Sequence, residues 1–126
     1  MAICSLDDVA NKRGVLKMKI AQVASLYESV PPKLYGGTER VVSYLTEDLI
    51  NQSHEVTLFA SADSTTKARL APCAQALGLD NAVKHPLVHY YIQLRSVLDE
   101  VEQCDIVHFH IGYLHFPRLI DSRCRT

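Results

Sequence analysis

The chain has 126 residues, of which 48% are hydrophobic and 21% are charged, and its net charge is −1 at pH 7. That length suits one domain with a modest core, and the near-zero charge gives no reason to expect nucleic acid or an anionic membrane as a partner. The four cysteines form no Cys-x-x-Cys pair, which argues against a zinc knuckle or a redox motif and favours a reducing, cytoplasmic location.

Residues 1–17 precede the first regular pattern. Asp7, Asp8, Lys12 and Arg13 interrupt any apolar run, so this segment is neither a signal peptide nor a membrane-spanning helix. We interpret it as an N-terminal extension, either an alternative start or a disordered arm.

The first predicted strand covers residues 19–26, a short apolar run that is typical of a strand buried on both faces. Gly36 and Gly37 follow, and they allow positive φ and a close approach of the backbone to a ligand. Thr38 can cap the helix that begins there, and Glu39 suits its positive first turn. Such a helix start favours an anion site, because its free N–H groups point outward together. The alternative is a plain strand–helix turn, since the glycine spacing matches neither a dinucleotide fingerprint nor a P-loop.

The helix predicted to follow these glycines runs to Asn51. Its 3.6-residue period places one apolar face on a sheet, comprising Val41, Val42, Leu45 and Leu49. Most of the remaining side chains are expected to face solvent, namely Glu39, Ser43, Glu47 and Asn51. Ser53 stands at the helix stop, where a left-handed conformation favours Gly, so it should make that stop slightly less stable.

Two further strands and a second helix are predicted next. Residues 55–60 form the second strand, and residues 67–73 form a short edge strand that Pro72 ends. Pro86 is favourable at the first position of the second helix. Its apolar residues recur at steps of three and four: Leu87, Tyr91, Leu94, Leu98 and Val101.

Residues 105–110 form the last predicted strand. Because side chains alternate, His108 and His110 share one face while Val107 and Phe109 share the other. In a sheet of order 3-2-1-4 this strand lies beside the first, and the crevice between them is the topological switch point. The glycine turn and the end of the histidine-rich strand should meet there.

The histidines admit other interpretations. His108, His110 and His115 could ligate a metal, but zinc normally takes carboxylates or cysteines nearby, and none has recognisable ligand spacing. We therefore predict no metal site. Polar contacts to a sugar or phosphate are favoured, and His108 is equally well explained as a half-buried core residue.

Several long segments resemble a known family. They are Lys-Ile-Ala-Gln-Val-Ala at residues 19–24, the unusual run Pro-Pro-Lys-Leu-Tyr-Gly-Gly-Thr-Glu-Arg at residues 31–40, His-Glu-Val-Thr-Leu-Phe-Ala at residues 54–60, and Asp-Ile-Val-His-Phe-His at residues 105–110. Together they resemble the N-terminal domain of GT-B glycosyltransferases, in particular the retaining, nucleotide-sugar-dependent enzymes of glycosyltransferase family four. The resemblance covers residues 18–117 and fades over residues 118–126, a divergent tail.

This resemblance implies an α/β fold, a partial Rossmann-like three-layer sandwich with a mostly parallel sheet of order 3-2-1-4. It implies transfer of a sugar from a nucleoside diphosphate sugar to an acceptor with retention of configuration. The donor-binding domain of the family is not matched here, so we assign no catalytic residue and no bound cofactor, and we expect the chain alone to be inactive. The implied substrate-binding residues are Gly36, Gly37, Thr38, Glu39, Arg40, His108, His110 and Tyr113.

Two functions remain open at this point. The first is a glycosyltransferase fragment that contacts a sugar acceptor or the donor phosphate, and the second is a non-catalytic binding or interaction module. The outer edge of the strand at residues 105–110 has no predicted neighbour, so we also expect self-association or pairing with a separate donor domain through that edge.

Overall fold

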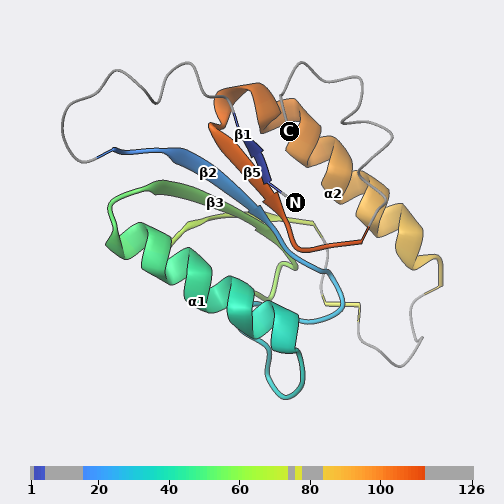
Figure 1. Ribbon diagram of the computed structural model, residues 1–126. Coiled ribbons are helices and arrows are strands. Elements are labelled where there is room, and N and C mark those ends of the chain that lie inside the picture. Colours follow the sequence, from blue (N-terminus) through green and yellow to red (C-terminus); the bar gives the residue numbers. More distant parts are fainter. Residues whose placement is uncertain (1, 5–15, 74–75, 78–83, 113–126) are drawn as a thin grey trace.

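The computed structural model describes residues 2–4, 16–73, 76–77 and 84–112 (Figure 1). These residues form a five-stranded sheet of order β1-β5-β2-β3-β4 and two long helices. The elements are β1 (Ala2–Cys4), β2 (Lys19–Val23), α1 (Gly37–Asn51), β3 (Glu55–Ala60), β4 (Arg69–Pro72), α2 (Pro86–Glu100), the short 3₁₀ helix η1 (Val101–Gln103) and β5 (Ile106–Phe109).

The predicted strand order 3-2-1-4 is confirmed. It corresponds to β4-β3-β2-β5, and all three of these pairings are parallel. In the centre of the sheet, Ala21 of β2 is paired with Thr57 of β3 and with Val107 of β5. This arrangement brings the carboxyl ends of β2 and β5 side by side.

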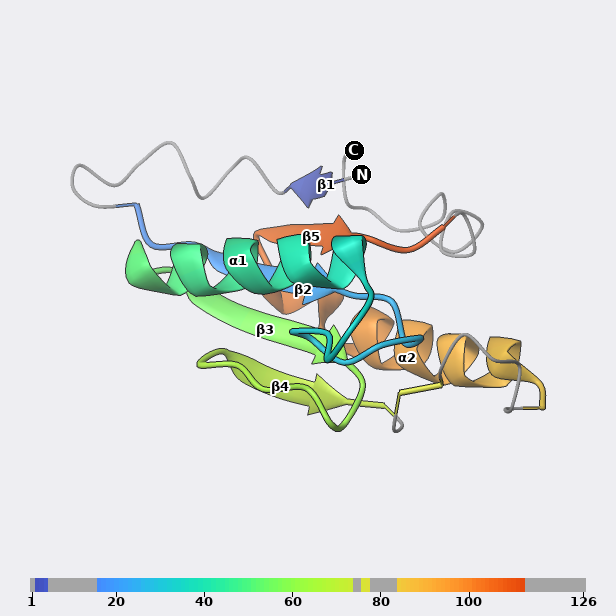
Figure 2. The ribbon, with the colours of Figure 1, turned by 90° about the horizontal axis from the view of Figure 1, so that it is seen from below.

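The two helices cover opposite faces of the sheet, which makes the fold a three-layer, Rossmann-like sandwich (Figures 1 and 2). On the α2 face the larger core packs Leu94 and Val97 against Phe59 and Phe109. On the α1 face the buried cluster comprises Ala24, Val30, Val42, Leu58 and Ala60.

The helices form where predicted, but their buried faces differ from the predicted ones. In α1, Val42 and Thr46 are buried, while Val41 is 59% exposed, so the prediction for Val41 is wrong. Val42 and Thr46 are one helical turn apart, whereas Val41 points about 100° away from Val42. Glu39, which was expected to face solvent, is buried.

The same kind of correction applies to α2. Leu87 and Tyr91 are exposed, whereas Tyr90 and Gln93 are buried with the core residues of this helix. Gln93 is accommodated because its amide nitrogen donates to the carbonyl oxygens of Ala24 and Phe59, at 3.0 and 3.2 Å. A polar side chain that satisfies two backbone carbonyls therefore occupies an interface that periodicity assigns to apolar residues.

The expectation of a bare edge beside the histidine-rich strand is wrong. β1 pairs antiparallel with β5, with Ala2 opposite His108 and Cys4 opposite Ile106 (Figure 2). The backbone of residues 2–4 supplies the N–H and C=O groups that the edge of β5 would otherwise present. This part of the extension is a strand rather than a disordered arm, and the argument for self-association through that edge loses its premise.

Some predictions fall on residues that the structure does not describe, including Tyr113, the tail at residues 118–126 and most of residues 1–17. Within the described ranges, neither long helix combines the length and apolarity needed to cross a lipid bilayer.

Candidate functional site

A pocket of about 400 Å³ lies at the carboxyl ends of β2 and β5. The first turn of α1, the first turns of α2 and the residues that follow β5 all contribute to its wall. It is lined by Ser25, Tyr27, Thr38, Glu39, Leu87, Tyr90, His110, Ile111 and Gly112. The predicted meeting of the glycine turn and the end of the histidine-rich strand is thus confirmed, at the switch point of the sheet.

The start of α1 depends on a single glycine conformation. Gly36 is the N-cap and has φ of 134°, which L-residues rarely adopt. A Cβ atom on Gly36 would lie 2.7 Å from Oε2 of Glu39 and 2.9 Å from Cβ of Pro32. Gly37 is the first helical residue and would have nothing within 4 Å of an added Cβ. The positive φ that the sequence suggested for the glycine pair is therefore found at Gly36.

Thr38 does not cap the helix, contrary to the prediction. The N-cap is one residue before the first helical residue, Gly37, so Thr38 already lies inside the first turn, and no side chain forms a cap hydrogen bond. The N–H groups of the first turn consequently lack the side-chain acceptor that a Ser or Thr cap would provide. Thr38 lines the pocket instead.

Glu39 and Arg40 have different surroundings. Glu39 is only 7% exposed and lines the pocket, and none of the described residues forms a hydrogen bond or an ion pair with its carboxylate. Arg40 is exposed, its Nη2 donates to the carbonyl oxygen of Leu34 at 3.4 Å, and it is not among the residues that line the pocket. Of these two neighbours in the sequence, only Glu39 reaches the pocket.

Two hydroxyl groups form a network on the opposite wall. The Tyr90 hydroxyl accepts the N–H of Leu26 at 3.1 Å and lies 3.2 Å from Oγ of Ser25, and that Oγ accepts the N–H of Tyr27 at 3.2 Å. Burial is the largest cause of a raised pKa of Tyr90, so this phenol stays protonated at neutral pH. The two hydroxyls share one hydrogen bond, which leaves one of their two protons available for a further acceptor.

The last polar group in the wall is His110. Burial, together with the neighbouring His108, lowers the pKa of His110 to about 4, so its imidazole is neutral at pH 7. The Nε2 atom lies 2.6 Å from Oε1 of the buried Gln22. Because that oxygen can only accept, Nε2 carries the proton and Nδ1 is left as the acceptor of the ring. Burial also lowers the pKa of His108, whose ring centroid lies 4.1 Å from that of His110.

Comparison with known families identifies the group to which this domain belongs. Residues 35–125, more than half of the chain, match the sequence profile of Glycosyltransferase Family 4. The chain belongs to glycosyltransferase family 4. A search of curated proteins gave no match.

The structure brings some of the predicted residues of this family 4 domain together and separates others. Thr38, Glu39 and His110 line the pocket, and Gly36 shapes the turn beside them. Arg40 and His108 are not among the lining residues, and Tyr113 lies outside the described ones. The predicted binding role of all these residues remains a prediction.

The predicted binding residues do not include Ser25, Tyr27 or Tyr90. Tyr90 and Tyr91 could form a sugar-stacking pair, but their place on a periodic helix favours core and surface roles, and Ser25 falls within the predicted strand at residues 19–26. The available signal was positional: Ser25 and Tyr27 directly follow a buried strand whose carboxyl end was already expected to face the crevice.

The described residues contain no group of three or more His, Cys, Asp or Glu side chains arranged to hold a metal.

Proposed function

We propose that this family 4 domain takes part in the transfer of a sugar from a nucleoside diphosphate sugar to an acceptor, with retention of configuration. Its pocket would bind the sugar acceptor or the phosphate of the donor. The observation that supports this is the pocket at the switch point, because ligands of open α/β sheets bind at that crevice.

In this proposal, groups outside the pocket carry out the chemical step of sugar transfer. Tyr90 is held protonated, His110 is neutral with its Nε2 proton engaged by Gln22, and neither group is hydrogen-bonded to Glu39, the carboxylate of the pocket wall. The pocket is therefore suited to binding and orienting a ligand, which by itself can supply a large part of an enzymatic rate. A donor-binding domain, in the same polypeptide or in a separate chain, would complete the enzyme.

We also propose a cytoplasmic location. Among the described residues, Cys73 and Cys104 are free thiols, and scattered unpaired cysteines suit a reducing compartment.

The test is release of nucleoside diphosphate from a panel of nucleotide sugars, measured for the chain alone and for the chain supplied with donor domains of the family. We expect no release above buffer by the chain alone and turnover in at least one combination. The anomeric coupling constant in the proton spectrum of the product reports whether configuration is retained. Sugar binding without turnover in any combination would favour a non-catalytic binding module.

A further inference from the structure

The first two turns of α2 expose an apolar patch on the side of the helix that faces away from the sheet (Figure 1). Leu87, Val88, Tyr91 and Ile92 are each 52–60% exposed and lie outside the stripe that α2 buries in the core. They are one, three or four residues apart, so their side chains form one continuous surface, the α2 patch. Neighbouring apolar side chains on a helix surface often mark a site of association.

We propose that two copies of this chain associate through their α2 patches, with the two α2 helices antiparallel. The proposal concerns the outer face of α2 and does not depend on the function proposed for the pocket. A second copy is favoured over another occupant by two features of the helix, which are the charges at its ends and the symmetry of its exposed face.

The charges at the ends of α2 are the reverse of those that stabilise a single helix. α2 has no acidic residue in its first turn and no basic residue in its last turn. Lys84 precedes the N-cap residue His85, whereas Asp99 and Glu100 end the helix. Positive charge therefore adds to the positive end of the helix dipole, and negative charge adds to its negative end. An antiparallel second helix turns this cost into attraction, because each cationic end then lies beside an anionic end.

The exposed face of α2 is also complementary to itself. In an antiparallel pair centred between Tyr91 and Ile92, the Tyr91 side chain of each copy packs against Ile92 of the other. One turn away from this centre, Val88 meets Arg95, whose side chain is 77% exposed. The hydrocarbon stem of an arginine can lie along an apolar residue while its guanidinium stays in water. The centre of the pair is therefore apolar on both sides.

The same register brings the charged ends together. Lys84 and Asp99 are equally distant in sequence from the centre of the pair, so Lys84 of each copy lies opposite Asp99 of the other. Lys84 is exposed, and the Asp99 side chain is 60% exposed. Within the helix, Nε of Arg95 lies 3.3 Å from Oδ1 of Asp99, and a carboxylate can accept from a second cation at its other oxygen. The two-fold axis makes this ion pair occur twice.

The first experiment measures the mass of the full chain by sedimentation across a dilution series in low salt. One helix face forms a small interface, so we expect a reversible dimer with a dissociation constant of about 10–100 μM. Ile92→Glu puts a charge at the apolar centre and should weaken the dimer at least about tenfold. The matched control is Val41→Glu, which adds the same charge to the outer side of α1, where Val41 is 59% exposed, and should leave the dimer unchanged. Far-ultraviolet circular dichroism establishes that both variants are folded.

Charge reversal tests the antiparallel register. Lys84→Glu and Asp99→Lys each place like charges opposite one another, so each should weaken the dimer about threefold to tenfold in low salt. The double variant restores opposite charges with their signs exchanged, so it should bind more tightly than either single variant.

Three outcomes would overturn the proposal. The first is a monomer at every concentration, and the second is a dimer that Ile92→Glu leaves unchanged. The third is a double variant that binds no better than the single ones, which would contradict the antiparallel pairing. If the wild type is a monomer and floats with vesicles of phosphatidylcholine and phosphatidylglycerol, but Ile92→Glu does not, the α2 patch binds a lipid surface instead.

Discussion

The two ends of the parallel sheet carry similar numbers of polar residues and use them differently. At the carboxyl ends, Glu39, His110 and the hydroxyls of Ser25 and Tyr90 surround a pocket of about 400 Å³ and retain unused hydrogen-bonding capacity. At the amino ends, a smaller pocket of about 240 Å³ is lined by four charged residues of both signs: Lys19, Glu55, Arg69 and Glu100.

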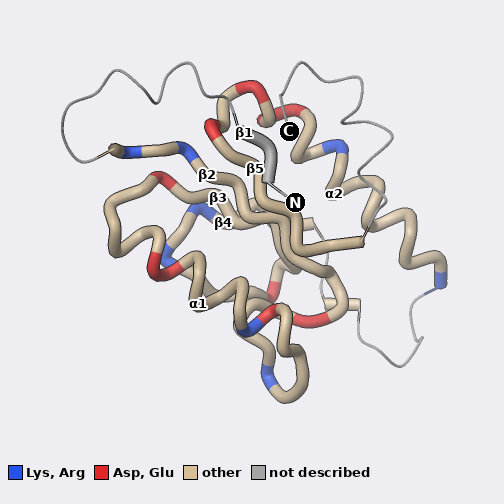
Figure 3. Tube along the Cα trace, in the orientation of Figure 1, with Lys and Arg blue, Asp and Glu red and all other residues tan. Residues whose placement is uncertain are grey.

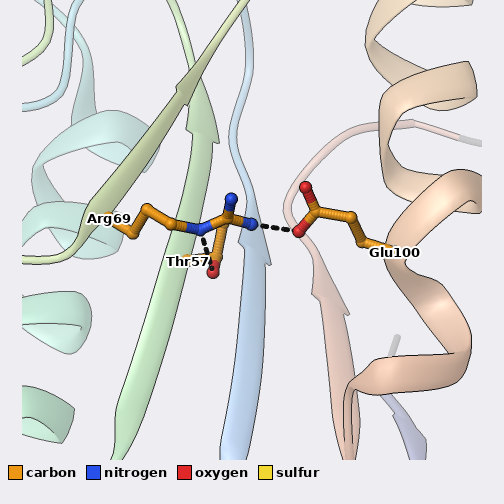
Figure 4. Close-up of polar contacts among 3 residues, drawn as sticks. All are labelled: Thr57, Arg69 and Glu100. Carbon is orange, nitrogen blue, oxygen red and sulfur yellow. Dashed lines mark hydrogen bonds and ion pairs between the residues drawn. The ribbon is translucent and has the colours of Figure 1, made fainter.

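At the amino end, polar groups bind one another across the sheet. Arg69 of β4 forms an ion pair with Glu100 at the end of α2, and its Nε donates to Oγ1 of Thr57 at 3.3 Å (Figure 4). Lys and Arg are spread over several elements rather than gathered on one (Figure 3). Arg69 and Glu100 at the amino end are thus paired with one another, whereas the carboxylate of Glu39 at the carboxyl end has no hydrogen-bond partner among the described residues.

The start of α1 should be the most sensitive point of the carboxyl end. Gly36→Ala forces a side chain into φ of 134° and into contact with Glu39 and Pro32, so we expect a loss of about 2–4 kcal/mol in the free energy of unfolding. Gly37→Ala is the matched control, because it has open space and helical backbone, and it should be neutral or stabilising by up to about 1 kcal/mol. Urea denaturation of both variants measures the difference. Equal effects at the two glycines would show that the turn does not require positive φ.

The second prediction concerns the hydroxyl network of Ser25 and Tyr90. Tyr90→Phe removes the acceptor of the buried N–H of Leu26, so unfolding should become easier by about 1–3 kcal/mol. Tyr91→Phe removes the hydroxyl of an exposed neighbour on the same helix and should change stability by less than about 0.5 kcal/mol. Thermal or urea unfolding of the pair tests whether the carboxyl-end polar groups are tightly held, and similar values would contradict that view.

The third prediction concerns His110, whose titration should make the free energy of unfolding depend on pH. Its pKa in the folded state, about 4, lies below the ordinary value of 6.5, so the unfolded chain binds more protons between these values. The contribution of neutral His110 to stability is fully present above pH 6.5 and is lost as the pH falls from 6.5 toward 4. His110→Gln should make the free energy of unfolding less dependent on pH in this window, by at most about 1.4 kcal/mol per pH unit, the value for one proton. Parallel pH profiles for the variant and the wild type would contradict the assignment.

Part of the fold and of the candidate site could be predicted from the sequence. Strand order, both helices and the place of the crevice followed from apolar periodicity and from the rules of parallel sheets, because burial on two faces restricts the pattern strongly. The burial of Glu39 and Gln93 could not be predicted in this way, since each depends on a contact or pocket formed by residues distant in sequence. β1 was missed because three residues are too few for a periodic signal, and they pair with a strand more than 100 residues later.

The end of α1, which points toward the amino end of the sheet, offers a stabilising change. Ser53 has φ of 70°, as its position at the helix stop predicted, and this left-handed conformation costs a residue with a Cβ about 1 kcal/mol. Ser53→Gly relieves that cost but adds chain entropy to the unfolded state, so we expect a net gain of about 0.5 kcal/mol. Ser43→Gly, in the interior of the same helix, should destabilise instead. A loss of stability in Ser53→Gly would contradict the strain that φ implies.

The smallest effect is expected at the ion pair between Arg69 and Glu100. The Arg69 side chain is 60% exposed and that of Glu100 is 31% exposed, so solvent screens their attraction, and Glu100→Gln should cost about 0–1 kcal/mol in low salt. Raising the salt concentration should bring the variant and the wild type together, because an exposed pair is screened over a short distance. Arg95→Gln, which breaks the more exposed pair with Asp99, provides a reference for a pair within one helix. Glu100→Gln could instead lower the free energy of unfolding more than Tyr90→Phe does, with a loss that persists in high salt. The ion pair between β4 and α2 would then contribute more to stability than the hydroxyl network around the pocket, and the contrast between the two ends of the sheet would be reversed.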